Sequence, residues 1–365
     1  MTKTFTNRAI PGQSLAPDII ERVSDASPQW LTAMLQHAGV DAAVRAVSTA
    51  PIGTGQMGST HRLRVEYEKG DGPNALVVKL PAADTATRSA GAISYRCETG
   101  FYREIAGNVK VRVPHCYFAG ISENNEVFTL VLEDLAPAQQ GDQIAGCTVE
   151  QARGAAINIA GLHGPTWNDP SLHELDWLIP GGADNAEFVA DFLRQATDAF
   201  LDRFTLTDRT AEVLKTFAGG STDWWRRSPE PFALLHSDYR LDNLMFAPAG
   251  AATPVVAVDW QVATIGLPLR DVAFLLGTGL QVEDRRSAER DIVADYHRAL
   301  GAFGVSDYSV EQCWLDYRYS LFQGPMITVF GAFLSQPSER GERMFAVMAE
   351  RSATAISDLD ALSLL

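Results

Sequence analysis

The stretch from Leu234 to Phe246, which reads LLHSDYRLDNLMF, decides how this chain is interpreted. It contains the pattern H-x-D-x-x-x-x-N, in which the aspartate is Asp238 and the asparagine is Asn243. A turn rich in Pro, Gly and Ala follows, and then an apolar strand that ends at Asp259. Phosphoryl transfer from ATP needs a carboxylate that orients and deprotonates an attacking hydroxyl, together with oxygen ligands for Mg²⁺. Asp238 suits the first role, and Asn243 and Asp259 suit the second.

A glycine-rich turn lies upstream of this segment. Gly53, Gly55 and Gly58 form the pattern G-x-G-x-x-G, whose glycines let backbone amides approach phosphate oxygens. A dinucleotide-binding fold needs a helix directly after such a turn. Here apolar and polar residues alternate after the turn, as in a strand, which is typical of a glycine-rich hairpin that covers ATP. An ordinary glycine turn is the alternative interpretation.

A lysine stands at the end of the next apolar strand. Lys79 follows Val77 and Val78, and an inward-facing lysine is costly there unless it meets an anion. A lysine held by a helical glutamate is well placed to bind the α- and β-phosphate oxygens of ATP. Glu98 and Glu104, on the helix predicted over 88–106, are the two candidates for that glutamate.

The order of predicted elements divides the chain into a sheet-rich part and a helical part. Strands predicted within 44–80, 114–119 and 127–132, together with the helix over 88–106, make a small sheet-rich lobe. Beyond residue 135, helical spacing dominates, over 149–163, 186–204, 208–218, 287–302 and 309–334, around a strand-rich insert at 233–262. We therefore expect an N-terminal helical extension at 1–44, an ATP-binding N-lobe at 45–135, and a C-lobe at 136–365 with the catalytic loop and the acceptor pocket.

From Pro51 to Leu276 these motifs resemble the aminoglycoside phosphotransferase and choline kinase-like superfamily of small-molecule kinases. The segment ETGFYRE, which begins at Glu98, resembles the E-x-x-F-Y helix of its ecdysteroid kinase-like members and favours Glu98 as the partner of Lys79. The catalytic segment also resembles the kinase domains fused to acyl-CoA dehydrogenases. Ser237 replaces the usual glycine after the histidine, and Asp259-Trp260-Gln261 replaces D-F-G.

The resemblance implies an α+β, protein kinase-like bilobal fold, with a five-stranded antiparallel sheet and one helix in the N-lobe and a mainly helical C-lobe. It also implies that LVLEDL, which includes Glu133 and Leu135, is a hinge whose backbone faces adenine. ATP and Mg²⁺ are the implied cofactors. We expect His236 to hold the loop through backbone hydrogen bonds, and Asp271 to cap a helix or tie down the catalytic loop.

Composition excludes several other classes. The formal net charge of −15 disfavours nucleic acid as a partner, because such a chain repels phosphate backbones. The four cysteines show no C-x-x-C pair, and no signal peptide or membrane span is encoded, so we expect a cytoplasmic protein with free thiols. The sequence makes no prediction about oligomeric state.

The acceptor is expected to be a small molecule, since no long activation segment or A-P-E element follows Asp259 to hold a peptide. An aromatic cluster in the C-terminal part favours a partly apolar alcohol, such as a hydroxylated lipid, a sterol or a hydroxyacyl thioester. The acidic net charge instead suits a cationic acceptor such as an aminoglycoside or choline. The members of the aromatic cluster are Trp224, Trp225, Trp314, Tyr317, Tyr319, Phe322, Phe330 and Phe333.

Two functions of other classes are weaker alternatives. A nucleotide-binding pseudokinase that serves as an interaction module has no need of the full set of Lys79, Asp238, Asn243 and Asp259. A nicotinamide-dependent oxidoreductase is disfavoured by the strand that follows the glycine-rich turn.

Overall fold

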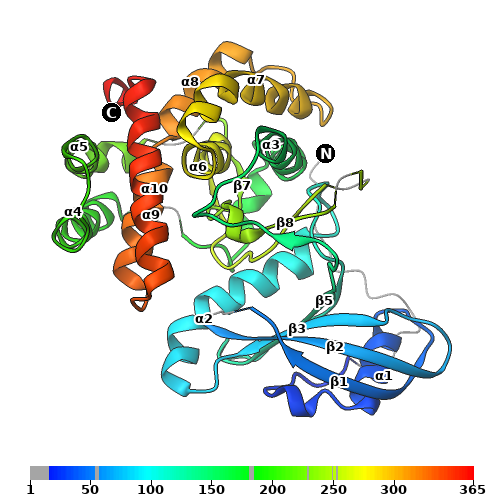
Figure 1. The fold of residues 1–365 in the computed structure, drawn as a ribbon. Coiled ribbons are helices and arrows are strands. Elements are labelled where there is room, and N and C mark those ends of the chain that lie inside the picture. The colour runs from blue at the N-terminus through cyan, green and yellow to red at the C-terminus, as the bar shows by residue number, and fades with distance from the viewer. Residues whose placement is uncertain (1–15, 54–56, 181–184, 228–229, 249, 252–253) are drawn as a thin grey trace.

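The structure is a computed structural model that describes residues 16–53, 57–180, 185–227, 230–248, 250–251 and 254–365 (Figure 1). A five-stranded antiparallel sheet occupies one end of the molecule, and the helices α3 to α10 form the rest (Figure 1). The predicted α+β, bilobal kinase-like architecture is confirmed. The division of the chain at residues 44 and 135 stays a prediction.

The sheet has the strand order β1-β2-β3-β5-β4. Its strands are β1 (Ala43–Pro51), β2 (Gly58–Lys69), β3 (Ala75–Pro81), β4 (Cys116–Ile121) and β5 (Phe128–Glu133). Leu63 and Val65 of β2 are buried and alternate with more exposed residues, so one face of the sheet carries a core. Helix α1 (Pro28–His37) buries Leu31, Met34 and Leu35 in that core, so the segment predicted as an extension packs on the sheet.

Helix α2 (Thr85–Gly100) and the π-helical turn η2 (Phe101–Ile105) connect the sheet to the helical part. Together they cover the helix predicted over 88–106. Figure 1 shows α2 between the sheet and the helices above it. Tyr95 and Cys97 of α2 and Phe101 of η2 belong to the large core of the helical part, which also takes in residues of β5, and not to the core beneath α1.

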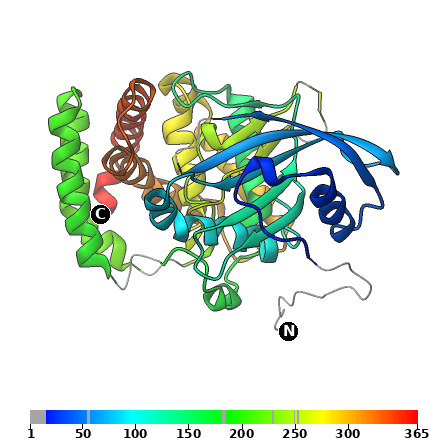
Figure 2. The same cartoon turned by 90° about the horizontal axis from the view of Figure 1, so that it is seen from below.

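The helical part holds most of the buried side chains. Figure 2 shows α4 and α5 at the opposite end of the molecule from α1. Its helices are α3 (Val149–His163), α4 (Ala186–Arg203), α5 (Asp208–Arg226), α6 (Leu269–Gly279), α7 (Val282–Gly301), α8 (Val310–Ser320), α9 (Gln323–Leu334) and α10 (Glu339–Asp358). None of the helices formed by described residues is long and apolar enough to cross a membrane.

Short strands position the catalytic segment at the edge of the helical part. β7 (Ala233–Leu235) pairs with β10 (Thr264–Gly266), and β8 (Leu244–Phe246) lies between β6 (Gln139–Gln140) and β9 (Val255–Ala257). The segment with Asp238 and Asn243 therefore runs from β7 in a two-stranded sheet to β8 in a three-stranded sheet, which fix its two ends.

Two predicted elements need correction. The helical spacing predicted over 309–334 corresponds to two helices, α8 and α9, with a break at Leu321 and Phe322. Pro325 explains the break, since proline is tolerated in the first turn of α9 but not inside a continuous helix. Helix α5 also runs to Arg226, well beyond the predicted end at residue 218.

Candidate active site

The loop that carries Asp238 is held by a buried aspartate of α6. Asp271 accepts hydrogen bonds from the backbone N–H of His236 (2.7 Å) and of Ser237 (2.8 Å). His163, at the end of α3, lies 3.2 Å from the same carboxylate through Nε2. The ring of His236 contacts the Val258 carbonyl at 2.9 Å. Asp271 thus ties down the catalytic loop, as expected. His236 makes backbone hydrogen bonds, which was also expected.

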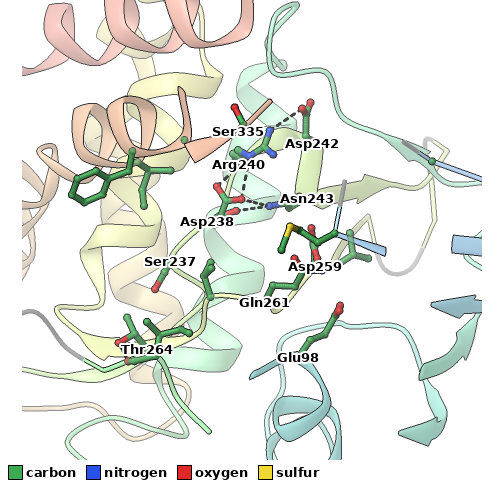
Figure 3. Close-up of a pocket in the computed structure, with 18 of the residues that line it drawn as sticks. Glu98, Ser237, Asp238, Arg240, Asp242, Asn243, Asp259, Gln261, Thr264 and Ser335 are labelled. Carbon is green, nitrogen blue, oxygen red and sulfur yellow. Dashed lines mark hydrogen bonds and ion pairs between the residues drawn. The ribbon is translucent and has the colours of Figure 1, made fainter. Parts of the chain in front are cut away.

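Ser237 has a left-handed backbone conformation, with φ of 68°. A non-glycine residue costs about 1 kcal/mol or more in this region, which explains why glycine is usual at this position. The two hydrogen bonds that the backbone of this segment donates to Asp271 hold the turn in place. The turn directs the next residue, Asp238, toward the cavity described below (Figure 3).

Asp238 is oriented by two neighbours in its own loop. Asn243 Nδ2 donates to the Asp238 carboxylate at 2.8 Å and to its carbonyl oxygen at 2.9 Å. Arg240 Nε lies 3.1 and 3.2 Å from the two carboxylate oxygens (Figure 3). Both oxygens are therefore engaged by donors within the loop, and the carboxylate still lines the cavity.

Lys79, Glu98 and Asp259 meet across the junction of sheet and helices. Lys79 Nζ lies 2.6 and 2.7 Å from the two Glu98 oxygens and 3.1 Å from Asp259 Oδ1. The structure pairs Lys79 with Glu98 and not with Glu104. Burial of Lys79 by itself lowers its pKa, but the Asp259 and Glu98 carboxylates outweigh this and raise the pKa above its usual value.

The pKa values of the two carboxylates are shifted in opposite directions, although the Lys79 ammonium lowers both. Burial raises the pKa of Glu98, even though the Lys79 ammonium opposes the shift. For Asp259, burial also raises the pKa, but the Lys79 ammonium with His236 and Arg240 holds it below its usual range. Asp259 is therefore the carboxylate that stays ionised most readily, as a metal ligand must.

The oxygen atoms of Asn243 and Asp259 fit a magnesium ion. Because the Asn243 nitrogen donates to Asp238, its side-chain oxygen is left for another partner. The Asp259 side chain is 40% exposed and lines the cavity rather than the core. The backbone of Asp259 has a positive φ of 68°. No group of three His, Cys, Asp or Glu in the described ranges forms a metal cage. Mg²⁺ often takes only one or two protein ligands and completes its shell with water and phosphate.

Trp260 anchors the segment next to Asp259. Its ring is fully buried and stacks on Phe101 of η2, with ring centres 3.7 Å apart and planes within 5°. Cys97 Sγ contacts the Trp260 carbonyl at 3.4 Å. The replacement of the usual phenylalanine by tryptophan thus ties the Asp259 segment to α2, the helix that carries Glu98.

The glycine-rich turn is described only in part. Gly53 has a φ of 73°, a conformation that L side chains rarely adopt, and it lines the cavity. Gly58 has another reason to be glycine, since a Cβ there would lie 2.5 Å from the Leu80 carbonyl of the neighbouring strand. Gly55 lies outside the described residues. On the far side of the turn, the Tyr95 hydroxyl of α2 donates to the Met57 carbonyl.

The segment after β5 lies on the opposite wall of the cavity. Glu133 and Leu135 both line the cavity. The Glu133 carboxylate accepts from Arg112 at 2.7 and 2.8 Å and from the backbone N–H of His115 at 3.0 Å, so both of its oxygens have protein partners. The backbone N–H of Glu133 donates to the His115 carbonyl. The carbonyl of Leu135 accepts from Ala138, whereas its N–H has no acceptor among the described residues.

These groups line one continuous cavity of about 1720 Å³ between the sheet and the helices. One half, called the nucleotide half because the sequence predicts the nucleotide there, has apolar walls from Ile52, Val77, Leu132, Met245 and Val258. The other, called the acceptor half for the predicted acceptor, is lined by helices α6, α8, α9 and α10 and by the end of α5. Its apolar walls include Met326, Ile327, Phe330, Met344, Phe345 and Met348.

Part of the predicted aromatic cluster belongs to the core instead. Tyr317 and Phe322 are fully buried, and Phe333 is 46% exposed. Of the eight predicted members, those that line the acceptor half are Trp225, Tyr319 and Phe330.

Polar residues of the acceptor half were not found from the sequence. Arg340 of α10 donates to both oxygens of Asp242 at 2.9 Å, and Arg240 donates to Asp242 at 2.8 Å. Gln323 of α9 donates to the Ser237 carbonyl at 2.9 Å. Arg270 also lines this half. These residues come from distant helices, so no local motif marks them.

Comparison with known proteins gives one family match. A family model described as the ecdysteroid kinase-like family matches residues 53–303. Acyl-CoA dehydrogenase family member 11 of Gallus gallus is 45% identical to this chain over 42 residues. That segment is 12% of this chain and 5% of the Gallus gallus protein.

Several solved structures share the fold over nearly their whole length. A GDP complex of aminoglycoside 2'-phosphotransferase-IIIa is 14% identical, with a TM-score of 0.52 over 89% of this chain and 98% of that one. Choline kinase from Cryptosporidium parvum Iowa II is 10% identical, with a TM-score of 0.53 over 86% and 89%. Plasmodium vivax ethanolamine kinase is 12% identical, with a TM-score of 0.51 over 96% and 95%. At these identities the likeness concerns the fold.

Proposed function

Since the chain belongs to the ecdysteroid kinase-like family, we propose that it is an ATP- and Mg²⁺-dependent phosphotransferase that moves the γ-phosphate of ATP to a hydroxyl of a small molecule. The observation that carries this proposal is the convergence of Lys79, Glu98, Asp238, Asn243 and Asp259 on one cavity. In the sequence these residues are spread over 181 positions, from 79 to 259. Their meeting would serve no purpose in a protein that only presents a surface.

Asp238 is the catalytic residue of the proposal. It lines the cavity where both halves meet, and Arg240 and Asn243 fix the direction of its carboxylate. It orients the acceptor hydroxyl toward the γ-phosphate and accepts the proton of that hydroxyl as the new O–P bond forms. ADP leaves when the bond to the γ-phosphate breaks. Positioning and charge stabilisation supply most of the acceleration in such reactions.

The other residues bind and orient the nucleotide. Lys79, held by Glu98, contacts the α- and β-phosphates, and the turn of Gly53, Gly55 and Gly58 covers them. When bound through Asn243 and Asp259, Mg²⁺ neutralises the charge of the phosphate oxygens. The free N–H of Leu135 is available to the edge of adenine, beside the apolar walls of the nucleotide half.

The acceptor is proposed to be a partly apolar alcohol. The apolar side chains of α9 and α10 in the acceptor half support this class, which includes hydroxylated lipids, sterols and hydroxyacyl thioesters. The names of the structural neighbours, such as a GDP and kanamycin complex of a related fold and the choline kinase, favour a cationic acceptor as the second candidate.

Replacement of Asp238 tests the reaction. We expect Asp238→Ala to bind ATP with Mg²⁺ as the wild type does, but to lose phosphate transfer by about a hundredfold or more. The measurement is ADP release with a panel of apolar and cationic alcohols, beside calorimetric titration of ATP. Asp198→Asn, an exposed carboxylate of α4, is the matched control. Undiminished transfer in Asp238→Ala would refute the catalytic role, and failure of the wild type to bind ATP would favour the pseudokinase alternative.

A further inference from the structure

Arg270, the second residue of α6, is a cation without a protein counter-ion. Its guanidinium carbon lies 3.9 Å from the centre of the Trp224 ring and 5.4 Å from that of Trp225. Within the described part of the chain its guanidinium group makes no hydrogen bond or ion pair. Its side chain lines the acceptor half, where the guanidinium approaches Gly266 of β10. The two indole rings therefore hold a positive charge at the wall of the cavity.

The energetics of this arrangement favour an anion at the same place. Burial lowers the pKa of Arg270 to about 10, although the neighbouring Tyr319 and Asp271 oppose the shift. Asp271 does not neutralise the guanidinium, because its oxygens already accept from His236 and Ser237. A partly buried charge without a partner is costly, and an anionic ligand would remove that cost.

Further polar atoms in the acceptor half also lack partners. Ser237 Oγ, Gln323 Oε1 and Trp225 Nε1 are buried and make no hydrogen bond. Gln323 is 2% exposed and Ser237 is 7% exposed, and all three residues line the cavity. Trp225 adds an N–H donor beside Arg270, whereas Ser237 and Gln323 are next to the proposed catalytic loop. Such orphaned groups are rare in folded proteins unless a ligand or water binds them.

The carboxylates of the acceptor half are already engaged. Asp242 is held by Arg240 and Arg340. Asp316 accepts from Tyr308 and from Gln312, each at 2.8 Å, and burial raises its pKa. A cationic acceptor would need a free, ionised carboxylate, and apart from Asp238 only the exposed Glu230 is left in the described lining.

We infer that the acceptor is an aliphatic alcohol that also carries an anionic group, a carboxylate or a phosphate, and that Arg270 with Trp225 Nε1 binds this group. The inference rests on the proposed function, since it names the class of molecule that brings its hydroxyl to Asp238. Ser237 Oγ and Gln323 Oε1 are then the hydrogen-bond partners available near the hydroxyl end. The flexible Met326, Met344 and Met348 suit an aliphatic body between the two ends.

Binding of simple amphiphiles tests the anion site without any turnover. The full-length protein, saturated with ADP and Mg²⁺, is titrated calorimetrically with decanoate, decyl phosphate and decanol below their micelle-forming concentrations. We expect one or both anions to bind about tenfold or more tightly than decanol, and the better of the two identifies the group. Arg270→Gln should remove this preference and leave decanol binding unchanged. Arg270→Lys, which keeps the charge, should retain part of it.

Two further measurements distinguish a failure of the anion site from a failure of the proposed reaction. ADP binding measured in the same variants reports whether the fold and the nucleotide half are intact. Equal binding of decanol and both anions by the wild type would overturn the inference, as would an unchanged preference in a folded Arg270→Gln protein. If the anion preference depends on Arg270 but neither hydroxydecanoates nor a hydroxylated decyl phosphate are phosphorylated with ATP, the anion site stands and the proposed reaction fails.

Discussion

At the scale of single residues, Asp242 shows how the loop around Asp238 is held to the C-terminal helix. Its carboxylate accepts from Arg240, Arg340 and the backbone N–H of Gln143. Burial by itself raises the pKa of Asp242, but the hydrogen bonds from Arg340 and the charge of Arg240 bring it below its usual value. The folded protein therefore favours the ionised form of this group.

A depressed carboxylate pKa makes a pH-dependent contribution to stability. The contribution is full above the ordinary carboxylate pKa and is lost as the pH falls through the lower, folded value. We expect Asp242→Asn to lower the free energy of unfolding by about 2 kcal/mol at neutral pH, a value limited by the exposure of Arg340. The difference from the wild type should shrink as the pH falls below about 4.

Urea unfolding of both proteins at neutral and acidic pH measures this difference. Asp198→Asn, with its exposed carboxylate, serves again as the control and should show no change. A wild-type advantage of the same size at both pH values would contradict the role of the ionised carboxylate.

Residues of the site differ in how far the sequence predicts them. Asp238 and Asn243 are found because a short motif holds them at a fixed distance along the chain, and Asp259 because it ends the apolar strand that follows. Arg270 and Gln323 are not found, because nothing local distinguishes an arginine that stacks on Trp224 from one that faces solvent. Only the packing of α5, α6 and α9 brings those side chains to the cavity.

At the scale of elements, α3 is predicted to the residue and α10 is not predicted at all. Thr148 and Gln151 form a capping box, which fixes where α3 begins. Helix α10 shows an equally usable signal, since its buried residues Met344, Met348 and Ser352 recur every four positions. The break between α8 and α9 depends on Pro325. The sequence does not predict this break, because the apolar pattern continues on both sides of it.

Helix α3 offers a test of close packing with an internal control. A Cβ on Gly161 would lie 2.5 Å from the Val111 nitrogen and 2.6 Å from the Lys110 carbonyl carbon, both of them backbone atoms. Gly154 lies on the same helix, and a Cβ there would meet only the Val255 side chain at 3.5 Å and that of Pro254 at 3.9 Å. We expect Gly161→Ala to destabilise the protein by about 2 kcal/mol. Gly154→Ala should instead stabilise it by up to about 1 kcal/mol, through helix propensity.

Thermal denaturation of the two alanine variants compares them directly. The expected shifts have opposite signs, so a general effect of alanine in α3 cannot produce them. Equal shifts of the same sign would show that the segment at 110–111 moves away from α3 at little cost.

At the scale of the whole molecule, the cavity is a joint product of the sheet and the helical part. Val77 comes from the sheet and Met245 from the helical part, and both line the nucleotide half. A ligand that fills this space contacts both parts, so it stabilises them together against unfolding. The bilobal fold follows from the order of elements, whereas the shape of the cavity follows from side-chain packing that no local pattern encodes.

Ligand-dependent melting is therefore informative about the entire chain. We expect ATP with Mg²⁺, at about 100 times its dissociation constant, to add about 2.7 kcal/mol to the stability and to raise the melting temperature by a few degrees. ATP with EDTA should give a smaller shift, because the charge of the phosphates then faces Asp259 without a cation. NADH should give none. A shift that does not depend on Mg²⁺ would argue against the proposal that Asn243 and Asp259 bind the metal.

The stacking of Trp260 on Phe101 has a pharmacological consequence. For Asp259 to swing out of the site, the neighbouring indole would have to leave a fully buried stack and expose both rings to water. The two aromatic rings thus fill the space next to Asp259. We expect no inhibitor to bind in that space. We therefore expect inhibitors directed at this site to bind in the cavity itself, where the nucleotide and the acceptor are proposed to bind.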